Sequence, residues 1–155
     1  CKTINDVDIY GFCSAAPRAP LVATGLIDSD QLARFKRMRE AAANAPQQVI
    51  ALMHHNVHDR GWRKNLMHGL TNRDEVLETL SNSGVGLLLH GHTHVAHRFT
   101  ADKMEVIGCG SSTWNSHVPA HTARFNVYEM RQGAPTTDVF IWNEASQRFS
   151  PDLTV

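Results

Sequence analysis

The chain has 155 residues, of which 42% are apolar and 19% charged, a composition that suits one globular domain with a hydrophobic core. Its 15 basic and 15 acidic side chains cancel, and neither sign forms a long block. Composition therefore gives no electrostatic basis for a nucleic-acid or membrane-surface partner, and specificity must come from a localised site.

The three cysteines, Cys1, Cys13 and Cys109, are an odd and scattered set without CxxC spacing. This pattern argues against a disulfide framework and a cysteine-rich zinc site, and a reducing, cytoplasmic location fits it best. No apolar run approaches the roughly 18 residues that span a bilayer, and the start CKTINDVD is unlike a signal or transit peptide. The missing initial methionine is compatible with processing, with a tag remnant or with a longer protein that has been cut.

The first predicted elements are a strand and a helix. Residues 8–15 (DIYGFCSA) are typical of a strand that runs into a loop. A helix is expected to begin at an Asp28/Gln31 capping box and to end at 44–46. Its apolar positions, at helical spacing, are Leu32, Phe35, Met38 and Ala42.

Residues 49–53 (VIALM) and 85–89 (VGLLL) are apolar at every position, as in strands covered on both faces. Between them, residues 57–71 lack a sustained period and predict a long loop. A second helix is expected from an Asn72/Glu75 capping box to Gly84. Two strand-helix-strand units predict a parallel, helix-covered sheet.

From Val95 onward the chain contains short β-like runs separated by turn signals at 101–103 and 132–135. Five such runs predict an antiparallel meander. The expected fold class is α/β, with a helix-covered parallel or mixed sheet followed by this meander, in a single domain over residues 1–155.

Both buried strands end in histidines, in the stretches ALMHHN and LLLHGHTH. Because the carboxyl ends of parallel strands share one edge of a sheet, His54 is expected to meet His92 and His94. Gly91 would let the backbone bend toward a ligand. Imidazole binds zinc, iron and manganese, so a metal site is the leading interpretation; chance His-x-His spacing and ordinary hydrogen-bonded histidines are the alternative.

A strand ending in H-H, followed by a strand ending in G-H-T-H, resembles the last two sequence blocks of the calcineurin-like metallophosphoesterases. GLIDSDQLARFKRM is similar to the helix before the fourth block, and EVIGCGSSTWN and ARFNVYEM are similar to the trailing strands. The resemblance covers almost the whole chain, and the nearest subgroup is the cyclic-nucleotide phosphodiesterase-like branch. HHN departs from the commoner H-H-P.

This resemblance implies the C-terminal half of an αββα sandwich and hydrolysis of phosphomonoesters or phosphodiesters. The complete enzyme would use a hydroxide activated by two divalent or trivalent ions, Mn, Fe or Zn, about 3.5–4 Å apart. His54 and His92 would bind one metal and His94 the other. Candidates that orient ligands or contact phosphate are His55, His90, Gly91 and Arg63. Buried, hydrogen-bonded histidines are an equal alternative for His55 and His90, and a solvated loop is the favoured alternative for Arg63, Lys64 and Trp62.

The family's first three blocks, D-x-H, G-D-x-x-D and G-N-H-D/E, do not occur in this sequence. They would carry the metal-binding carboxylates and the histidine that protonates the leaving group. This chain alone is therefore expected to bind no metal, or one weakly, and to be weak or inactive. The half-sandwich would leave a sheet face and a strand edge uncovered, which favours pairing with the missing N-terminal half or with a second copy.

Two alternatives to an enzyme fragment remain from the sequence. The chain is also compatible with a non-catalytic metal-binding or protein-interaction module that retains the fold. A gene-fragment product without a selected function is the third possibility. His117 and His121 receive no role.

Overall fold

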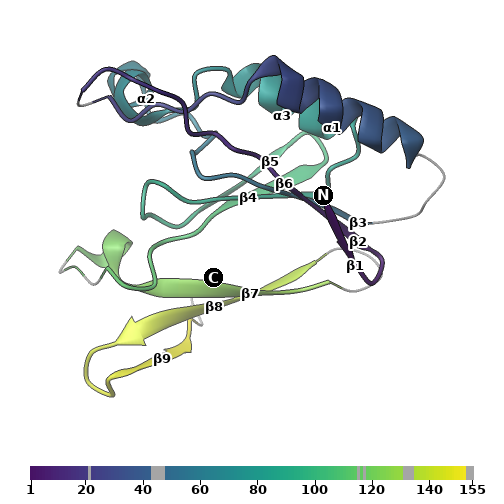
Figure 1. Ribbon diagram of the computed structural model, residues 1–155. Helices are drawn as coiled ribbons and strands as arrows, with labels where there is room; N and C mark the ends of the chain where they lie inside the picture. The colour runs from purple at the N-terminus through teal and green to yellow at the C-terminus, as the bar shows by residue number, and fades with distance from the viewer. Residues whose placement is uncertain (21, 43–47, 115, 117, 131–134, 153–155) are drawn as a thin grey trace.

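The computed structural model describes residues 1–20, 22–42, 48–114, 116, 118–130 and 135–152. Figure 1 shows three layers, in which two helices lie above a six-stranded sheet and a three-stranded sheet lies below it. Among the described residues, no helix has the length and apolar character needed to cross a membrane. The fold class is α/β, as predicted.

The six-stranded sheet has the order β1-β2-β3-β4-β6-β5. Its inner neighbours β2, β3, β4 and β6 run parallel, whereas β1 and β5 pair antiparallel at the two edges. The predicted strands at 49–53 and 85–89 are confirmed, with bounds shifted by one or two residues. The strands are β1 (Lys2–Ile4), β2 (Val7–Gly11), β3 (Gln48–Leu52), β4 (Leu87–His90), β5 (His97–Ala101) and β6 (Met104–Gly108).

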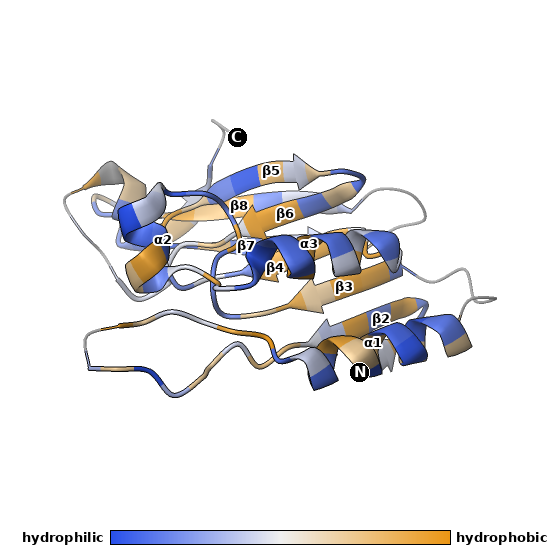
Figure 2. Cartoon of the chain, turned by 90° about the horizontal axis from the view of Figure 1, so that it is seen from above, coloured by the Kyte–Doolittle hydropathy of each residue, from blue (hydrophilic) through white to orange (hydrophobic). Residues whose placement is uncertain are grey.

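The two longer helices, α1 (Ser29–Ala41) and α3 (Arg73–Asn82), cover one face of this sheet. Figure 2 shows α1 lying over β2 and α3 over β4, with the mostly hydrophobic strand β3 visible between the two helices. The side chain of Asp28 accepts a hydrogen bond from the Gln31 backbone N–H at 2.8 Å, so the predicted cap of α1 is confirmed. The expected helix stop at 44–46 lies outside the described residues.

Helix α3 begins one residue after Asn72, as predicted, but Asn72 makes no capping hydrogen bond to the helix backbone. Its side chain instead accepts from the Ile27 backbone N–H and donates to the Ile27 carbonyl, at 3.3 and 2.8 Å. Gly84 follows the helix with φ 76°, the left-handed conformation that commonly ends helices. Asn72 therefore joins α3 to the segment before α1.

The prediction of an irregular loop over 57–71 was wrong at its centre, where α2 (Trp62–His68) forms about two turns. Gly61 precedes the helix with φ 86°, and no side chain caps it. None of the helix's residues is buried. A short helix without a buried stripe has no apolar periodicity, which is why the sequence pattern did not indicate it.

The lower layer is an antiparallel meander of β7 (Arg124–Glu129), β8 (Thr136–Asn143) and β9 (Arg148–Pro151). The predicted meander was too long, because β5 and β6 form a hairpin within the larger sheet and β6 pairs parallel with β4. The turn at 101–103 lies between β5 and β6, whereas 131–134 lie outside the described residues.

The second face of the larger sheet packs against this meander. Ile50, Leu87 and Ile107 form a small buried cluster, and Tyr128 and Met130 from the lower layer pack on it. The expected uncovered sheet face is therefore not on the larger sheet. The outward face is instead that of the lower sheet, whose strands carry rings that contact one another: Phe125, Phe140, Trp142 and Phe149.

Candidate functional site

Strands β3 and β4 bring two groups of histidines together at their carboxyl ends. Leu52 pairs with Leu89 across the two strands, and the backbone N–H of Gly91 donates to the carbonyl of His54 at 3.1 Å. The two chain segments therefore leave the sheet side by side. His54 Nε2 and His92 Nδ1 are 3.0 Å apart, and the His55 and His92 ring centroids are 4.5 Å apart. The expected convergence of His54 with His92 is observed.

The His54 and His92 nitrogens are joined by an imidazole hydrogen bond of 3.0 Å. Metal–nitrogen bonds of about 2.0–2.1 Å would place two tetrahedral ligand nitrogens about 3.3 Å apart, so a shared cation would require only a small separation of the two rings and loss of the hydrogen-bonded proton between them. Two imidazoles do not make a complete site, however. No group of three or more His, Cys, Asp or Glu side chains in the described part of the chain is placed to hold a metal ion. The residues present therefore do not fit a two-metal centre by themselves.

The bend after β4 is made by histidines rather than by glycine. His92 and His94 have φ values of 71° and 54°, a left-handed conformation that costs a residue with a side chain roughly 1–3 kcal/mol. A Cβ at Gly91 would lie 3.9 Å from the His54 carbonyl oxygen, an ordinary contact, so packing within the chain does not require glycine there. Such strained residues concentrate at functional sites, and here the strain falls on two candidate ligands.

His94 does not join the His54/His92 pair. Its ring lies edge-on to Trp114, with the ring centroids 5.1 Å apart. Trp114 in turn stacks at 6.2 Å on His121, a residue for which the sequence indicated no role. The predicted meeting of His54 with both His92 and His94 is therefore observed for His92 only, because the ring of His94 lies against Trp114.

The ring of His55 lies beside those of His54 and His92 and is held in a fixed orientation. Its Nδ1 is 2.8 Å from Ser14 Oγ, and its backbone N–H donates to the same oxygen at 3.3 Å. Gly25 lies against its ring, where a Cβ would approach within 2.5 Å. Burial lowers the pKa of His55, and the neighbouring His54 lowers it further, so the neutral imidazole is favoured. His55 is therefore placed to orient His92 through ring contact.

Burial also lowers the pKa of His92 to about 4, with His55, His54, His68 and His94 as smaller causes. A neutral imidazole is the form that binds metals, so no imidazolium charge has to be removed from His92 near neutral pH.

His90 lies in a second histidine cluster. It is only 4% exposed, its ring centroid is 5.8 Å from that of His58, and a Cβ at Gly108 would approach its ring within 2.6 Å. The His58 ring also lies 4.1 Å from that of His97. Burial lowers the pKa of both His90 and His58 to about 4. This is the environment of a buried neutral histidine.

Helix α2 contributes one histidine that the sequence pattern did not single out. His68, in its last turn, has its ring centroid 6.2 Å from that of His92. Arg63, in the first turn, lies over the exposed Trp62 ring at 5.1 Å. The short helix therefore directs His68 toward the histidine pair, whereas Arg63 stacks on its neighbour.

Known proteins are similar to this chain in fold, whereas no sequence match was found. No protein-family model matches the chain, and no curated protein matches it in sequence. The chain is similar to GAP50, the anchor in the inner membrane complex of Plasmodium, with a TM-score of 0.59 and 14% identity over 84% of this chain and 49% of that one. It is also similar to a dimetal phosphatase from Danio rerio, with a TM-score of 0.55 and 18% identity over 73% of this chain and 38% of that one.

The chain thus spans half or less of the length of these two solved structures. At such identities the similarity shows a shared fold. The architecture of this chain is accordingly metallophosphoesterase-like.

Proposed function

We propose that this chain supplies the histidine side of a metal-dependent phosphoesterase site that hydrolyses phosphomonoesters or phosphodiesters. The observation that carries the proposal is the pairing of His54 Nε2 and His92 Nδ1, 3.0 Å apart at the carboxyl ends of adjacent parallel strands. That edge is where open α/β sheets form ligand sites. The metallophosphoesterase-like fold supports the same interpretation, and one of its structural neighbours is a dimetal phosphatase.

The remaining ligands would come from a segment that carries the D-x-H, G-D-x-x-D and G-N-H blocks, on an N-terminal half or on another chain. The support is chemical, because two imidazoles leave the charge of a metal pair uncompensated. Two Mn, Fe or Zn ions would then bind with His54 and His92 on one side and His94 on the other. Without that segment, we expect no hydrolysis by this chain.

The lower sheet offers a surface for such a segment. Tyr128 packs toward the larger sheet, so Phe125 and Val127, at alternating positions of β7, face the other way. Phe140 pairs with Phe125 on the same outward face. The aromatic rings of this face support a proposed partner, either the missing half or a second copy.

The decisive experiment joins this chain to an N-terminal half carrying the three blocks and measures hydrolysis of bis-p-nitrophenyl phosphate with manganese. We expect His54→Ala and His92→Ala each to abolish most of the hydrolysis. His97→Ala is the matched control, because His97 contacts His58 and Phe99 instead of the pair. A fused protein whose rate does not exceed that of its His92→Ala variant would contradict the proposal.

A second candidate function is a non-catalytic interaction module. It is favoured by the lack, among the described residues, of any group of three metal-binding side chains. GAP50, a structural neighbour that shares the fold, is described as an anchor. Metal content and oligomeric state of the purified chain separate the candidates: a metal-free monomer would count against metal binding and pairing.

A further inference from the structure

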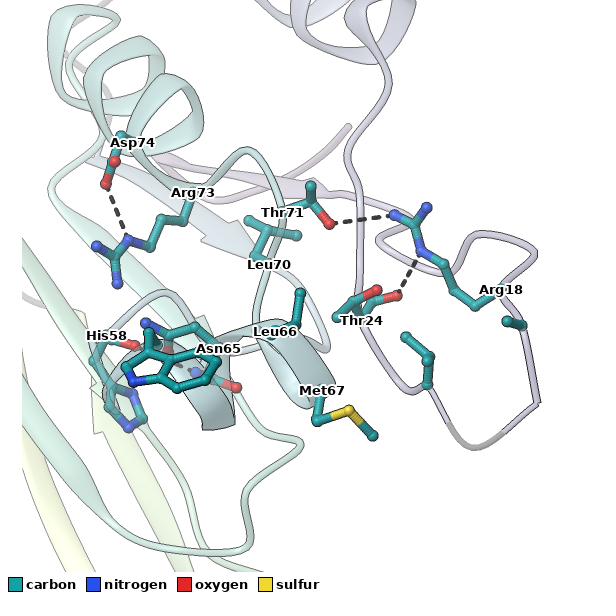
Figure 3. A pocket seen from close by; sticks show the side chains of 15 residues that line it. Arg18, Thr24, His58, Asn65, Leu66, Met67, Leu70, Thr71, Arg73 and Asp74 are labelled. Atoms are coloured by element: carbon teal, nitrogen blue, oxygen red, sulfur yellow. Dashed lines mark hydrogen bonds and ion pairs between the residues drawn. The ribbon is translucent and has the colours of Figure 1, made fainter.

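We propose that the chain has a separate site for an organic anion that carries an apolar body and an N–H donor. The site is a cavity of about 860 Å³ lined by α2, by residues 18, 19, 22 and 24, and by the start of α3 (Figure 3). Neither His54 nor His92 lines it. The inference therefore stands independently of the phosphoesterase proposal.

Asn56 provides the first argument for a ligand. It is only 1% exposed and lines the cavity, and its Oδ1 has no hydrogen-bond partner among the described residues. Its Nδ2 donates weakly to the His58 carbonyl, at 3.4 Å. Buried polar atoms are almost always satisfied, so an unpaired acceptor on a residue that lines a cavity indicates a donor that arrives with a ligand, once the side chain turns its oxygen toward it.

Arg73 provides an unpaired donor in the same cavity. Its Nε donates to Asp74 at 3.0 Å and its Nη2 contacts Asp59 at 3.5 Å, whereas its buried Nη1 has no partner in the described part of the chain. An acceptor at Asn56 and a donor at Arg73 together complement a group that carries both, of which a secondary amide is the simplest.

Helix α2 supplies the apolar wall. Trp62, Leu66 and Met67 are 72%, 65% and 37% exposed, and all three line the cavity with the buried Leu70. Three large apolar side chains are thus exposed on a seven-residue helix and line one cavity, and exposed apolar surface gathered at one place marks binding surfaces. A planar or aliphatic ligand body would remove this surface from water.

Arg18 supplies a positive charge at the opposite side. Figure 3 shows Arg18 and Arg73 on either side of Leu66 and Met67. Arg18 donates to the carbonyls of Thr24 and Gly25 and to Thr71 Oγ1, and it forms no ion pair with a carboxylate of the described residues. These bonds fix the guanidinium without neutralising it, which suits an anionic oxygen of the ligand.

The proposed ligand thus has an N–H donor for Asn56 at one end, an apolar body against α2, and an anion at Arg18. We choose 4-acetamidobenzoate as the probe, since it has these three parts in order. Its matched partner is 4-(2-oxopropyl)benzoate, in which a CH₂ replaces the N–H while the size, the carbonyl and the charge are kept. Because the tetrahedral CH₂ also turns the acetyl group out of the ring plane, the Asn56→Leu variant separates the two effects. Neither compound is a phosphoester, so their binding does not depend on metal or on hydrolysis.

The experiment is isothermal titration calorimetry of the whole chain with each probe in the presence of EDTA. We expect the acetamido compound to bind about tenfold more tightly, because the oxopropyl analogue leaves the buried Asn56 acceptor unpaired. Asn56→Leu should remove that difference. Arg18→Gln should weaken both probes by a similar factor, and Arg34→Gln, an equal charge change on exposed α1, should weaken neither.

Equal affinities for the two probes, or no heat from either, would overturn the proposal. This comparison uses the unaltered protein and remains decisive if Asn56→Leu does not fold. Binding that persists unchanged in Arg18→Gln would also contradict the assigned anion position. Failure of the phosphoesterase assay with normal probe binding would leave this site intact, so the two proposals fail separately.

Discussion

Gly25 determines how closely the backbone approaches the ring of His55. A Cβ at this position would lie 2.5 Å from His55 Cγ and 2.9 Å from the Ser14 carbonyl oxygen. Ser14 and His55 are both buried, and their side chains are hydrogen-bonded to each other, so neither residue can move freely. We expect Gly25→Ala to lower the free energy of unfolding by roughly 1–3 kcal/mol, as overpacked cores do, measured by urea denaturation.

The matched control is Gly86→Ala, because a Cβ at Gly86 meets no atom within 4 Å. It should change the free energy of unfolding by less than about 0.5 kcal/mol. Equal stability of the Gly25 and Gly86 variants would show that the packing around His55 is looser than these distances indicate.

Cys109 should react more slowly than the other thiols. Burial raises its pKa, whereas Cys1 and Cys13 are exposed. Alkylation proceeds through the thiolate, and a raised pKa reduces the thiolate fraction at any pH below it. We expect iodoacetamide near pH 8.5 to label Cys1 and Cys13 well before Cys109, as measured by peptide mass spectrometry. The difference should disappear in concentrated urea; equal native rates would contradict the prediction.

At the scale of elements, Asn72 joins α3 to the segment that leads into α1. Its side chain pairs with both backbone polar groups of Ile27, a residue that is 0% exposed. Asn72→Ala would leave those groups buried and unpaired, so we expect the free energy of unfolding to fall by about 2 kcal/mol. Asn82→Ala, at the exposed end of the same helix, is the control and should have little effect in the same denaturation experiment.

Elements with a continuous or periodic apolar pattern were predictable from the sequence. The runs 49–53 and 85–89, which make up most of β3 and β4, are apolar throughout because both faces are covered, and α1 has a side-chain cap at Asp28. Helix α2 was not predictable, since it buries none of its residues. The placement of β6 beside β4 was also missed, because pairing between strands distant in sequence leaves no local signal.

The sequence was sufficient to predict that the candidate site lies at the carboxyl ends of two neighbouring strands. Histidines after two parallel strands had to converge, and His54 and His92 do. The backbone is left-handed at His92 and His94, and this conformation could not be predicted from the sequence because histidine does not favour it. The contributions of Ser14, Gly25 and His68 come from other elements, so only the fold could place them there.

The whole molecule contains two sheets of unequal burial. Strands β3, β4 and β6 are mostly buried, whereas no described residue of β7, β8 or β9 is. Tyr128 and Met130 of the lower layer pack on the Ile50 cluster of the larger sheet. Weakly buried elements open at lower free energy than the core. The outward aromatic face of this sheet and its limited attachment are both consistent with a layer that a partner would stabilise.

Amide hydrogen exchange can test this difference in attachment. We expect amides of β7 and β8 to exchange through openings of lower free energy than those of β3 and β4. Tyr128→Ala should lower protection in the lower sheet by roughly 1–3 kcal/mol, because it removes the ring that packs on the larger sheet. Tyr128→Phe keeps the ring and loses only the hydroxyl that accepts from Asn126, so it should have a smaller effect. Identical protection in both sheets, lost together in Tyr128→Ala, would mean that the layers unfold as one cooperative unit.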